Sequence, residues 1–288
     1  MIDDVTVMIL GAGSSFQYGF PTGPELKKWM LSEAQKPDTW PKHFDGFCPP
    51  EMADDLRNAL IASPDDSIDA VLKRRGGLGP IGRMMIARRI ASCEQDKNVF
   101  PARGWYKDLF HMLRLDDDNF RSPNLIIITF NYDRSLEYYL MRTIDSALEG
   151  HGQKMAKYKL KNIMIHHVHG SLGPLNEVPY GLNGNETLLP AAYENIRVIS
   201  DASLDSSEEY RSAVYALQHA HRVFILGFGF DETNMTRLQL DKIIGKVPVY
   251  STNYRLSCKA DLINRYGKDI QFFARKVDDC IPKMSKLL

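Results

Sequence analysis

Six short runs of apolar and β-branched residues recur along the chain, and five of them end at glycine or polar residues. Runs of this length and composition predict buried strands. Helical patterns lie between most of the runs that follow the first hundred residues. Strands that alternate with helices predict an α/β fold with a doubly wound, mostly parallel sheet. The predicted strands are residues 5–10, 125–130, 163–168, 223–228, 247–252 and 270–277.

The long interval between the first two predicted strands shows no strand pattern. Amphipathic segments there predict helices, with Pro and Gly breaks near 49–50 and 76–80. We therefore expect one domain formed by residues 1–36 and 119–288, interrupted by a helical insertion subdomain at 37–118. The predicted insertion helices are 54–62, 67–75, 81–93 and 105–113, and the others are 24–35, 135–148, 207–220, 232–244 and 259–266.

Composition excludes several classes of protein. The chain has 36 basic and 36 acidic residues, so the basic surplus typical of nucleic-acid binding is absent. No apolar run is long enough to span a bilayer, and the acidic start lacks the features of a secretory signal. The four cysteines are widely spaced without a CxxC pair, which disfavours a four-cysteine zinc site and predicts a reducing, cytoplasmic location.

Small and polar residues follow each of the first five predicted strands. In an open α/β sheet, ligands bind beyond the carboxyl ends of the strands, so these residues are expected to converge on one crevice. They are GAGSS at 11–15, TFNYD at 129–133, HHVHGS at 166–171, GFGFD at 227–231 and STN at 251–253. The Gly-, Pro- and Asn-rich connection at 171–196 lies beside this crevice, and we interpret it as a mobile lid.

The first glycine loop allows two interpretations. Gly11 and Gly13 would let the backbone approach a pyrophosphate, but a tight turn explains them equally well. Phe16 stands where the dehydrogenase fingerprint has its third glycine, and no acid-ended strand follows about 20 residues later. A hydride-transferring dehydrogenase is therefore disfavoured. Thr22 and Glu25 have the spacing of a capping box at the start of the next helix.

In this order, GAGSS, TFNYD, VHGS, a glycine-rich strand end and a later Asn resemble the sirtuin family over residues 5–23 and 124–255. Within that family the pattern is similar to the bacterial sirtuin-like NAD hydrolases of anti-phage defence. The resemblance implies a Rossmann-like, sirtuin-like fold that binds NAD as its substrate, with no metal. It also implies two catalytic residues, His169 and Asn131, the second placed near the nicotinamide ribose and its water.

The resemblance implies a set of cofactor-binding residues as well. Asp133 would hold the nicotinamide carboxamide, and Asn253 would contact the adenosine end. The remaining members would line the phosphates and riboses: Gly11, Ala12, Gly13, Ser15, Thr22, Gly227 and Gly229.

Departures from the sirtuin pattern favour hydrolysis over deacylation. The chain lacks the paired CxxC motifs of the zinc module, and Phe20-Pro21-Thr22-Gly23-Pro24 replaces the Pro-Asp-Phe-Arg that follows the first loop in sirtuin deacylases. Water then becomes the expected acceptor, giving nicotinamide and ADP-ribose. Two alternatives remain: an NAD-dependent protein deacylase, and a module that binds NAD or ADP-ribose without turnover. Control by homo-oligomerisation or by a separate regulatory partner is also expected.

Structural roles compete with these assignments. Asx residues cap helices, so Asn131 and Asp133 suit a helix start, and Asn253 suits a turn. The pair Asp231 and Asn234 suits a helix cap and a ligand contact equally well. His167 and His169 lie on one face of a strand, which would suit a metal, but no third ligand is evident in the sequence.

Overall fold

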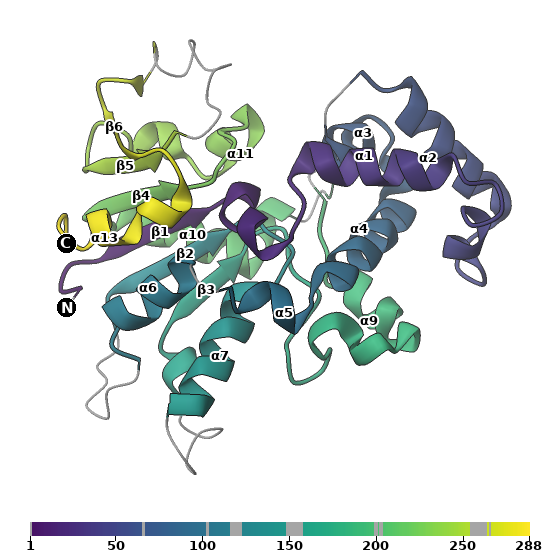
Figure 1. The fold of residues 1–288 in the computed structure, drawn as a ribbon. Helices are drawn as coiled ribbons and strands as arrows, with labels where there is room; N and C mark the ends of the chain where they lie inside the picture. The colour runs from purple at the N-terminus through teal and green to yellow at the C-terminus, as the bar shows by residue number, and fades with distance from the viewer. Residues whose placement is uncertain are drawn as a thin grey trace.

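The computed structural model describes residues 2–64, 67–101, 104–115, 123–147, 158–198, 201, 204–253, 264 and 266–288. Its centre is a six-stranded sheet in the order β3-β2-β1-β4-β5-β6, and every neighbouring pair is parallel (Figure 1). The predicted doubly wound α/β sheet is therefore confirmed. The strands are β1 (Thr6–Leu10), β2 (Leu125–Thr129), β3 (Met164–His167), β4 (Arg222–Leu226), β5 (Val249–Thr252) and β6 (Ile270–Ala274).

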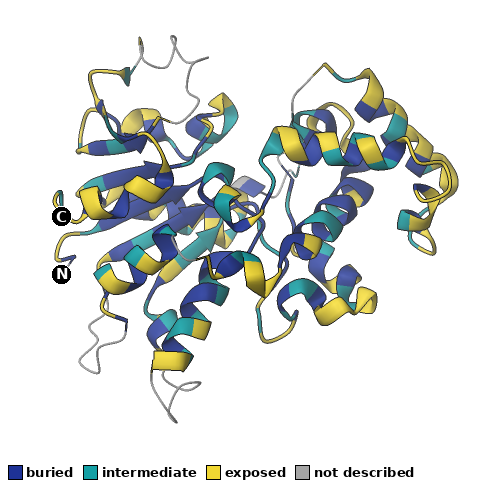
Figure 2. Ribbon diagram, viewed as in Figure 1, coloured by how far each residue is buried: buried dark blue, intermediate teal, exposed yellow. Residues whose placement is uncertain are grey.

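Helices cover both faces of the sheet, and the side chains of β1 show how the two layers form. Met8 and Leu10 belong to the hydrophobic cluster that contains residues of α6 (Trp105–Met112), α7 (Ser135–Ala147) and α13 (Ile281–Met284). Val7 and Ile9 belong to the cluster that contains residues of α10 (Glu208–Gln218). Successive side chains of a strand point to opposite faces, so an apolar run without alternation is buried on both sides. Figure 2 shows the central strands β1, β2 and β4 mostly buried between these helices.

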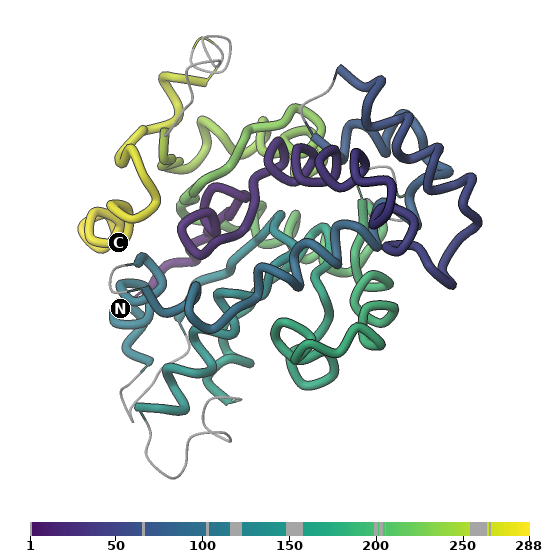
Figure 3. The backbone as a smooth tube through the Cα atoms, turned by 45° about the vertical axis from the view of Figure 1, so that its right-hand side comes forward, coloured from purple at the N-terminus to yellow at the C-terminus, as the bar shows by residue number. Residues whose placement is uncertain are grey.

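Helices surround the sheet, and several of those in the first half of the chain form a group beside it. The helices are α1 (Gly23–Ala34), α2 (Pro50–Ala62), α3 (Ile68–Arg74), α4 (Gly79–Cys93), α5 (Asp96–Val99), α6 (Trp105–Met112), α7 (Ser135–Ala147), α9 (Leu189–Glu194), α10 (Glu208–Gln218), α11 (Glu232–Arg237) and α13 (Ile281–Met284). Helices α1 to α4 pack on one another and α9 packs on α4, whereas α6 packs on α7 and α13 (Figure 3). No strand occurs in the described residues between 37 and 118. The division into two domains at residues 36 and 118 stays a prediction.

Two predicted elements differ from the structure. The helix predicted at 232–244 ends at Arg237, because the backbone turns at Gln239, whose φ is +54°, and a short 3-10 turn follows. The helix predicted at 259–266 lies almost wholly outside the described residues. Among the described residues, no helix has the length and apolar character needed to cross a membrane.

The segment 171–196 is held by packing and hydrogen bonds in this structure, and its role as a mobile lid stays a prediction. This segment includes α9, which packs on α4. The guanidinium of Arg134 donates to the carbonyls of Gly173, Val178 and Pro179 within it. These hydrogen bonds satisfy backbone acceptors that a mobile loop would leave to water.

Candidate active site

The loops that follow β1 and β4 contact each other at the point where the strand order reverses. Gly13 N donates to Gly227 O at 2.9 Å, and Gly11 N donates to Leu226 O at 3.0 Å. Gly227 has φ +59°, and a Cβ there would collide with the backbone of Gly13 and Ser14. A Cβ on Gly13 would lie 2.9 Å from Gly227 O. These glycines are therefore required for loop-to-loop packing, whatever else they contact.

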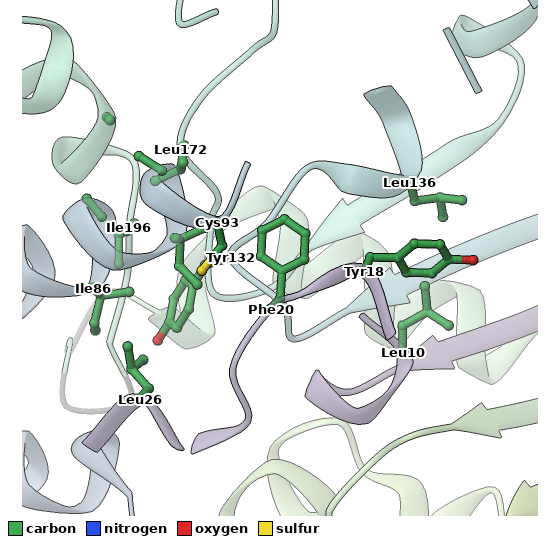
Figure 4. Close-up of a cluster of buried hydrophobic side chains, with 14 of the residues drawn as sticks. Leu10, Tyr18, Phe20, Leu26, Ile86, Cys93, Tyr132, Leu136, Leu172 and Ile196 are labelled. Carbon is green, nitrogen blue, oxygen red and sulfur yellow. The ribbon is translucent and has the colours of Figure 1, made fainter. Parts of the chain in front are cut away.

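A cleft of about 410 Å³ opens beside these loops, at the carboxyl ends of the strands. Its volume lies in the usual range for small-molecule sites. Phe20, Leu26 and Tyr132 line it and belong to the buried cluster drawn in Figure 4. The predicted site residues that line the cleft are Gly11, Ala12, Ser15, Asn131, Asp133, His169 and Gly229.

Asn131 presents an unpartnered acceptor to the cleft. The residue is buried, and its Nδ2 donates to Ser14 Oγ at 3.1 Å and to Ser15 Oγ at 2.9 Å. These two bonds fix the orientation of the amide. Its Oδ1 is buried and has no hydrogen-bond partner. Asn131 does not cap α7, so its side chain is available to a ligand as an acceptor.

His169 presents a second unpartnered atom. Its side chain stands edge-on to Phe130, with 5.3 Å between ring centroids, and its Nε2 is buried without a partner. Burial and the nearby Arg237 lower the pKa of His169 to about 4, against the opposing effects of Asp231 and Asn234. The imidazole is therefore neutral at pH 7, and an unprotonated nitrogen can accept a hydrogen bond.

Asn234 also lines the cleft, and the sequence leaves it open between a helix cap and a ligand contact. Asp231 Oδ1 accepts from Asn234 N at 3.0 Å, so Asp231 caps α11 as one interpretation predicted. The side chain of Asn234 lines the cleft, and its Oδ1 is buried without a partner. The only signal in the sequence was its position in the first turn of a helix that begins directly after a strand end.

Asp133 caps a helix and also lines the cleft, so its position suits both the capping role and the ligand contact predicted for it. Its Oδ1 accepts from Ser135 N at 3.1 Å and from the Ser135 hydroxyl, so it caps α7. It also lines the cleft. Burial raises the pKa of its carboxyl above the usual value, while hydrogen bonds from Ser135 and Ser15 oppose that rise.

The structure does not bring Thr22, Gly13, Gly227 and Asn253 into the lining of the cleft. Thr22 N and Oγ1 instead bind Glu25 Oε2 at 2.9 and 2.7 Å, which confirms the capping box. Asn253 is exposed, and its N–H donates to Ala274 O at 3.0 Å. The predicted contact of Asn253 with the adenosine end therefore lies outside this cleft.

Helix α3 forms one wall of the cleft, which the sequence did not predict. Ser67, Asp69 and Lys73, at and within α3, line it. The hydroxyl of Tyr132 donates to Asp69 Oδ1 at 3.2 Å. Lys73 Nζ reaches Thr233 Oγ1 at 3.4 Å, from α3 to α11.

The described residues hold no group of three or more His, Cys, Asp or Glu side chains placed to bind a metal. Both ring nitrogens of His167 are already hydrogen-bonded to protein acceptors, Asn131 O and Glu137 Oε1. The pairing of His167 with His169 as metal ligands is therefore not supported.

One family model matches a part of the chain that includes several residues of this site. No curated protein matches the chain. Residues 125–252, from β2 to β5, match the model of the SIR2-like domain, and they include Asn131, His169 and Asn234. SIR2-like domains are generally NAD-dependent enzymes, so the match fits an NAD-related function. Residues 125–252 are thus similar to the SIR2-like domain, which supports the sirtuin-like family that the motifs resemble.

Proposed function

We propose that the protein hydrolyses NAD at the nicotinamide–ribose bond and releases nicotinamide and ADP-ribose. The observation that carries the proposal is a set of three buried polar atoms without a hydrogen-bond partner, all in side chains of residues that line one cleft: Asn131 Oδ1, His169 Nε2 and Asn234 Oδ1. A buried acceptor without a partner costs about 1–3 kcal/mol, so such a cluster favours a ligand rich in donors. Ribose hydroxyls and a water molecule are donors of this kind.

The charges of the cleft suit the cleavage step. When the C1′–N bond breaks, its electron pair goes to the nicotinamide nitrogen, and positive charge develops on the ribose. Carboxylates of Asp69, Asp133 and Asp231 line the cleft and would stabilise that charge. The leaving group departs neutral, so no strong acid is needed to protonate it.

The acceptor atoms suit the hydration step. Asn131 Oδ1 accepts a hydrogen bond from the attacking water and orients it without adding charge. Neutral His169 accepts a hydrogen bond from a ribose hydroxyl or from that water. The water oxygen bonds to C1′ and its proton passes through His169 to solvent, which balances the reaction.

The wall formed by α3 favours hydrolysis over deacylation. Lys73 and Thr233 meet from α3 and α11, and Asp69 contacts Tyr132, so α3 closes one side of the cleft and leaves less room for a peptide. Water reaches the site without such a groove. The deacylase and the non-catalytic binding module stay as alternatives that the experiment below separates.

A biological role follows from the sequence resemblance. We propose that NAD depletion serves bacterial anti-phage defence in the cytoplasm, and that homo-oligomerisation or a separate partner restrains the activity until infection. A purified protein that is fully active as a monomer, without any partner, would contradict this restraint.

The test measures by chromatography how much nicotinamide the purified protein releases from NAD, with and without candidate partners. We expect His169→Ala and Asn131→Ala to abolish release, and Asn234→Ala to reduce it about 10-fold, while all three keep the fold. His219→Ala, at the exposed residue that follows α10, is the matched control and should retain full release. Release that requires an acylated peptide would establish the deacylase instead. NAD bound intact after prolonged incubation would establish the binding module.

A further inference from the structure

A buried histidine that the proposed reaction does not use lies directly behind Asn131. His167 Nδ1 is 2.9 Å from Asn131 O, and His167 Nε2 is 2.5 Å from Glu137 Oε1 on α7. The side chains of His167 and Glu137 are only 13% and 23% exposed. His167 therefore connects the backbone of a proposed catalytic residue to a carboxylate that is largely shielded from water.

Both partners of this imidazole are acceptors. A carbonyl oxygen cannot donate, and a neutral imidazole carries only one N–H. Both bonds are satisfied when His167 is an imidazolium that donates through each nitrogen and Glu137 is a carboxylate. A second arrangement has the same number of protons. In it Glu137 is protonated and donates to a neutral imidazole.

The surrounding charges favour the ion pair. On the face of β3 toward α7, His167 meets Glu137, with Asp133 close by and Arg134 beside Glu137. Burial opposes the charge on His167, but Glu137 and the Asn131 carbonyl outweigh it and raise the pKa of His167; His167 in turn lowers the pKa of Glu137. On the opposite face, His166 lies toward Glu209 of α10.

We propose that His167, held as an imidazolium by Glu137, is a positioning residue that fixes the backbone of Asn131 and so aims its amide into the cleft. The carbonyl of Asn131 is anchored by His167, its N–H donates to Thr129 Oγ1 at 3.1 Å, and its side chain is anchored by Ser14 and Ser15. Loss of the proton on His167 removes one of its two hydrogen bonds. The role in reaction depends on the proposed function, whereas the ion pair itself does not.

The experiment is a pH titration by NMR of the full-length protein labelled with ¹⁵N in its eight histidines and its amides. The His167 ring signals are identified by their loss in His167→Gln, and the Asn131 side-chain amide by its loss in Asn131→Ala. We expect both ring nitrogens of His167 to be protonated at pH 7, and the Asn131 amide signal to shift at the same pH as the ring. In Glu137→Gln, which keeps an acceptor oxygen, this midpoint should fall.

Turnover provides the second readout. Loss of the His167 proton should form the alkaline limb of kcat for nicotinamide release, and that limb should move to lower pH in Glu137→Gln. His167→Gln should lower kcat about 10²-fold with KM little changed, because misplacement of a catalytic group affects the reacting geometry more than binding. His166→Gln, on the other face of the same strand, is the matched control and should leave the profile unchanged.

The outcomes separate the two proposals. A neutral His167 at pH 7, or an Asn131 signal that ignores its titration, overturns the positioning role. A Glu137→Gln midpoint equal to that of the unaltered protein overturns it as well. If His167 and Asn131 titrate together as expected but no nicotinamide is ever released, the positioning role stands and the proposed hydrolase function fails.

Discussion

At the scale of single residues, His169 is held neutral in a place where protonation is unfavourable, and this has a consequence for stability. Its pKa is about 4 in the folded protein, lowered mainly by burial, against about 6.5 in an unfolded chain. Between these values the unfolded state binds a proton that the folded state does not. Stability therefore falls as pH falls through this window, by about 2 kcal/mol between pH 7 and pH 5.

We predict that His169→Gln removes this part of the acid sensitivity. Urea unfolding of both proteins at pH 7 and pH 5 measures it: the variant should lose about 2 kcal/mol less than the unaltered protein over that interval. Other groups titrate equally in both proteins and cancel in the comparison. Equal losses would mean that water or a partner stabilises the protonated ring at position 169.

The same scale shows which site residues the sequence can predict. Asn131 and His169 come directly after buried strands, so the sheet alone brings them to one edge. His167 was missed as a site residue because its role depends on a distant partner. The acceptor for His167 Nε2 is Glu137, 30 positions away on a helix, and no local pattern relates the two.

At the scale of elements, the loops after β1 and β4 depend on the backbone of Gly227. Its φ of +59° is disfavoured for other residues, and its Cα faces the Gly13–Ser14 backbone with no room for a side chain. A methyl group there would force apart the two loops that shape the cleft.

We predict that Gly227→Ala lowers the free energy of unfolding by about 2 kcal/mol or more, from backbone strain and the clash together. Gly229→Ala is the matched control: a Cβ at 229 meets nothing within 4 Å, so its folding stability should change little. Thermal or urea unfolding of the two variants gives the comparison. Equal stabilities would show that the β1 and β4 loops separate without cost.

Elements were predictable where one physical signal dominated. The strands are short apolar runs, of which β1, β2 and β4 are mostly buried, and the predicted ranges overlap all six strands. The helix predicted at 232–244 failed because Leu238, Leu240, Ile243 and Ile244 are all buried, so the apolar pattern continues beyond the end of α11. An apolar pattern reflects which residues are buried, and it does not indicate that the backbone changes direction at Gln239.

At the scale of the whole molecule, the cleft is bounded by parts of the chain that the sequence analysis treated as separate. The apolar pattern of 67–75 predicted a helix, and α3 is there, but nothing local indicated that Asp69 and Lys73 would face the strand ends. That placement follows from the packing of α3 on α1, α2 and α4. A second long-range contact joins Arg134 and Glu94. Their side chains are 2% and 0% exposed and form a two-point ion pair at 3.0 and 2.5 Å.

This ion pair joins three segments. Glu94 directly follows α4, Arg134 directly precedes α7, and both bind the 173–181 segment, where Gly181 N donates to Glu94 Oε2 at 2.8 Å. Removal of one charge from a buried pair leaves the other uncompensated in a medium of low polarity. We predict that Glu94→Gln destabilises the protein by about 3–5 kcal/mol, as measured by urea unfolding.

The control is Glu186→Gln, which breaks a second Arg–Glu pair, with Arg88, whose carboxylate is 70% exposed. Water replaces that partner, so the expected loss is below about 1 kcal/mol. Because the buried pair fixes α4 and the 173–181 segment against the start of α7, Glu94→Gln should also speed hydrogen exchange of amides in 173–181 more than in the strands. Uniform acceleration across the chain would mean that the ion pair stabilises the fold as a whole and does not anchor this segment beside the cleft.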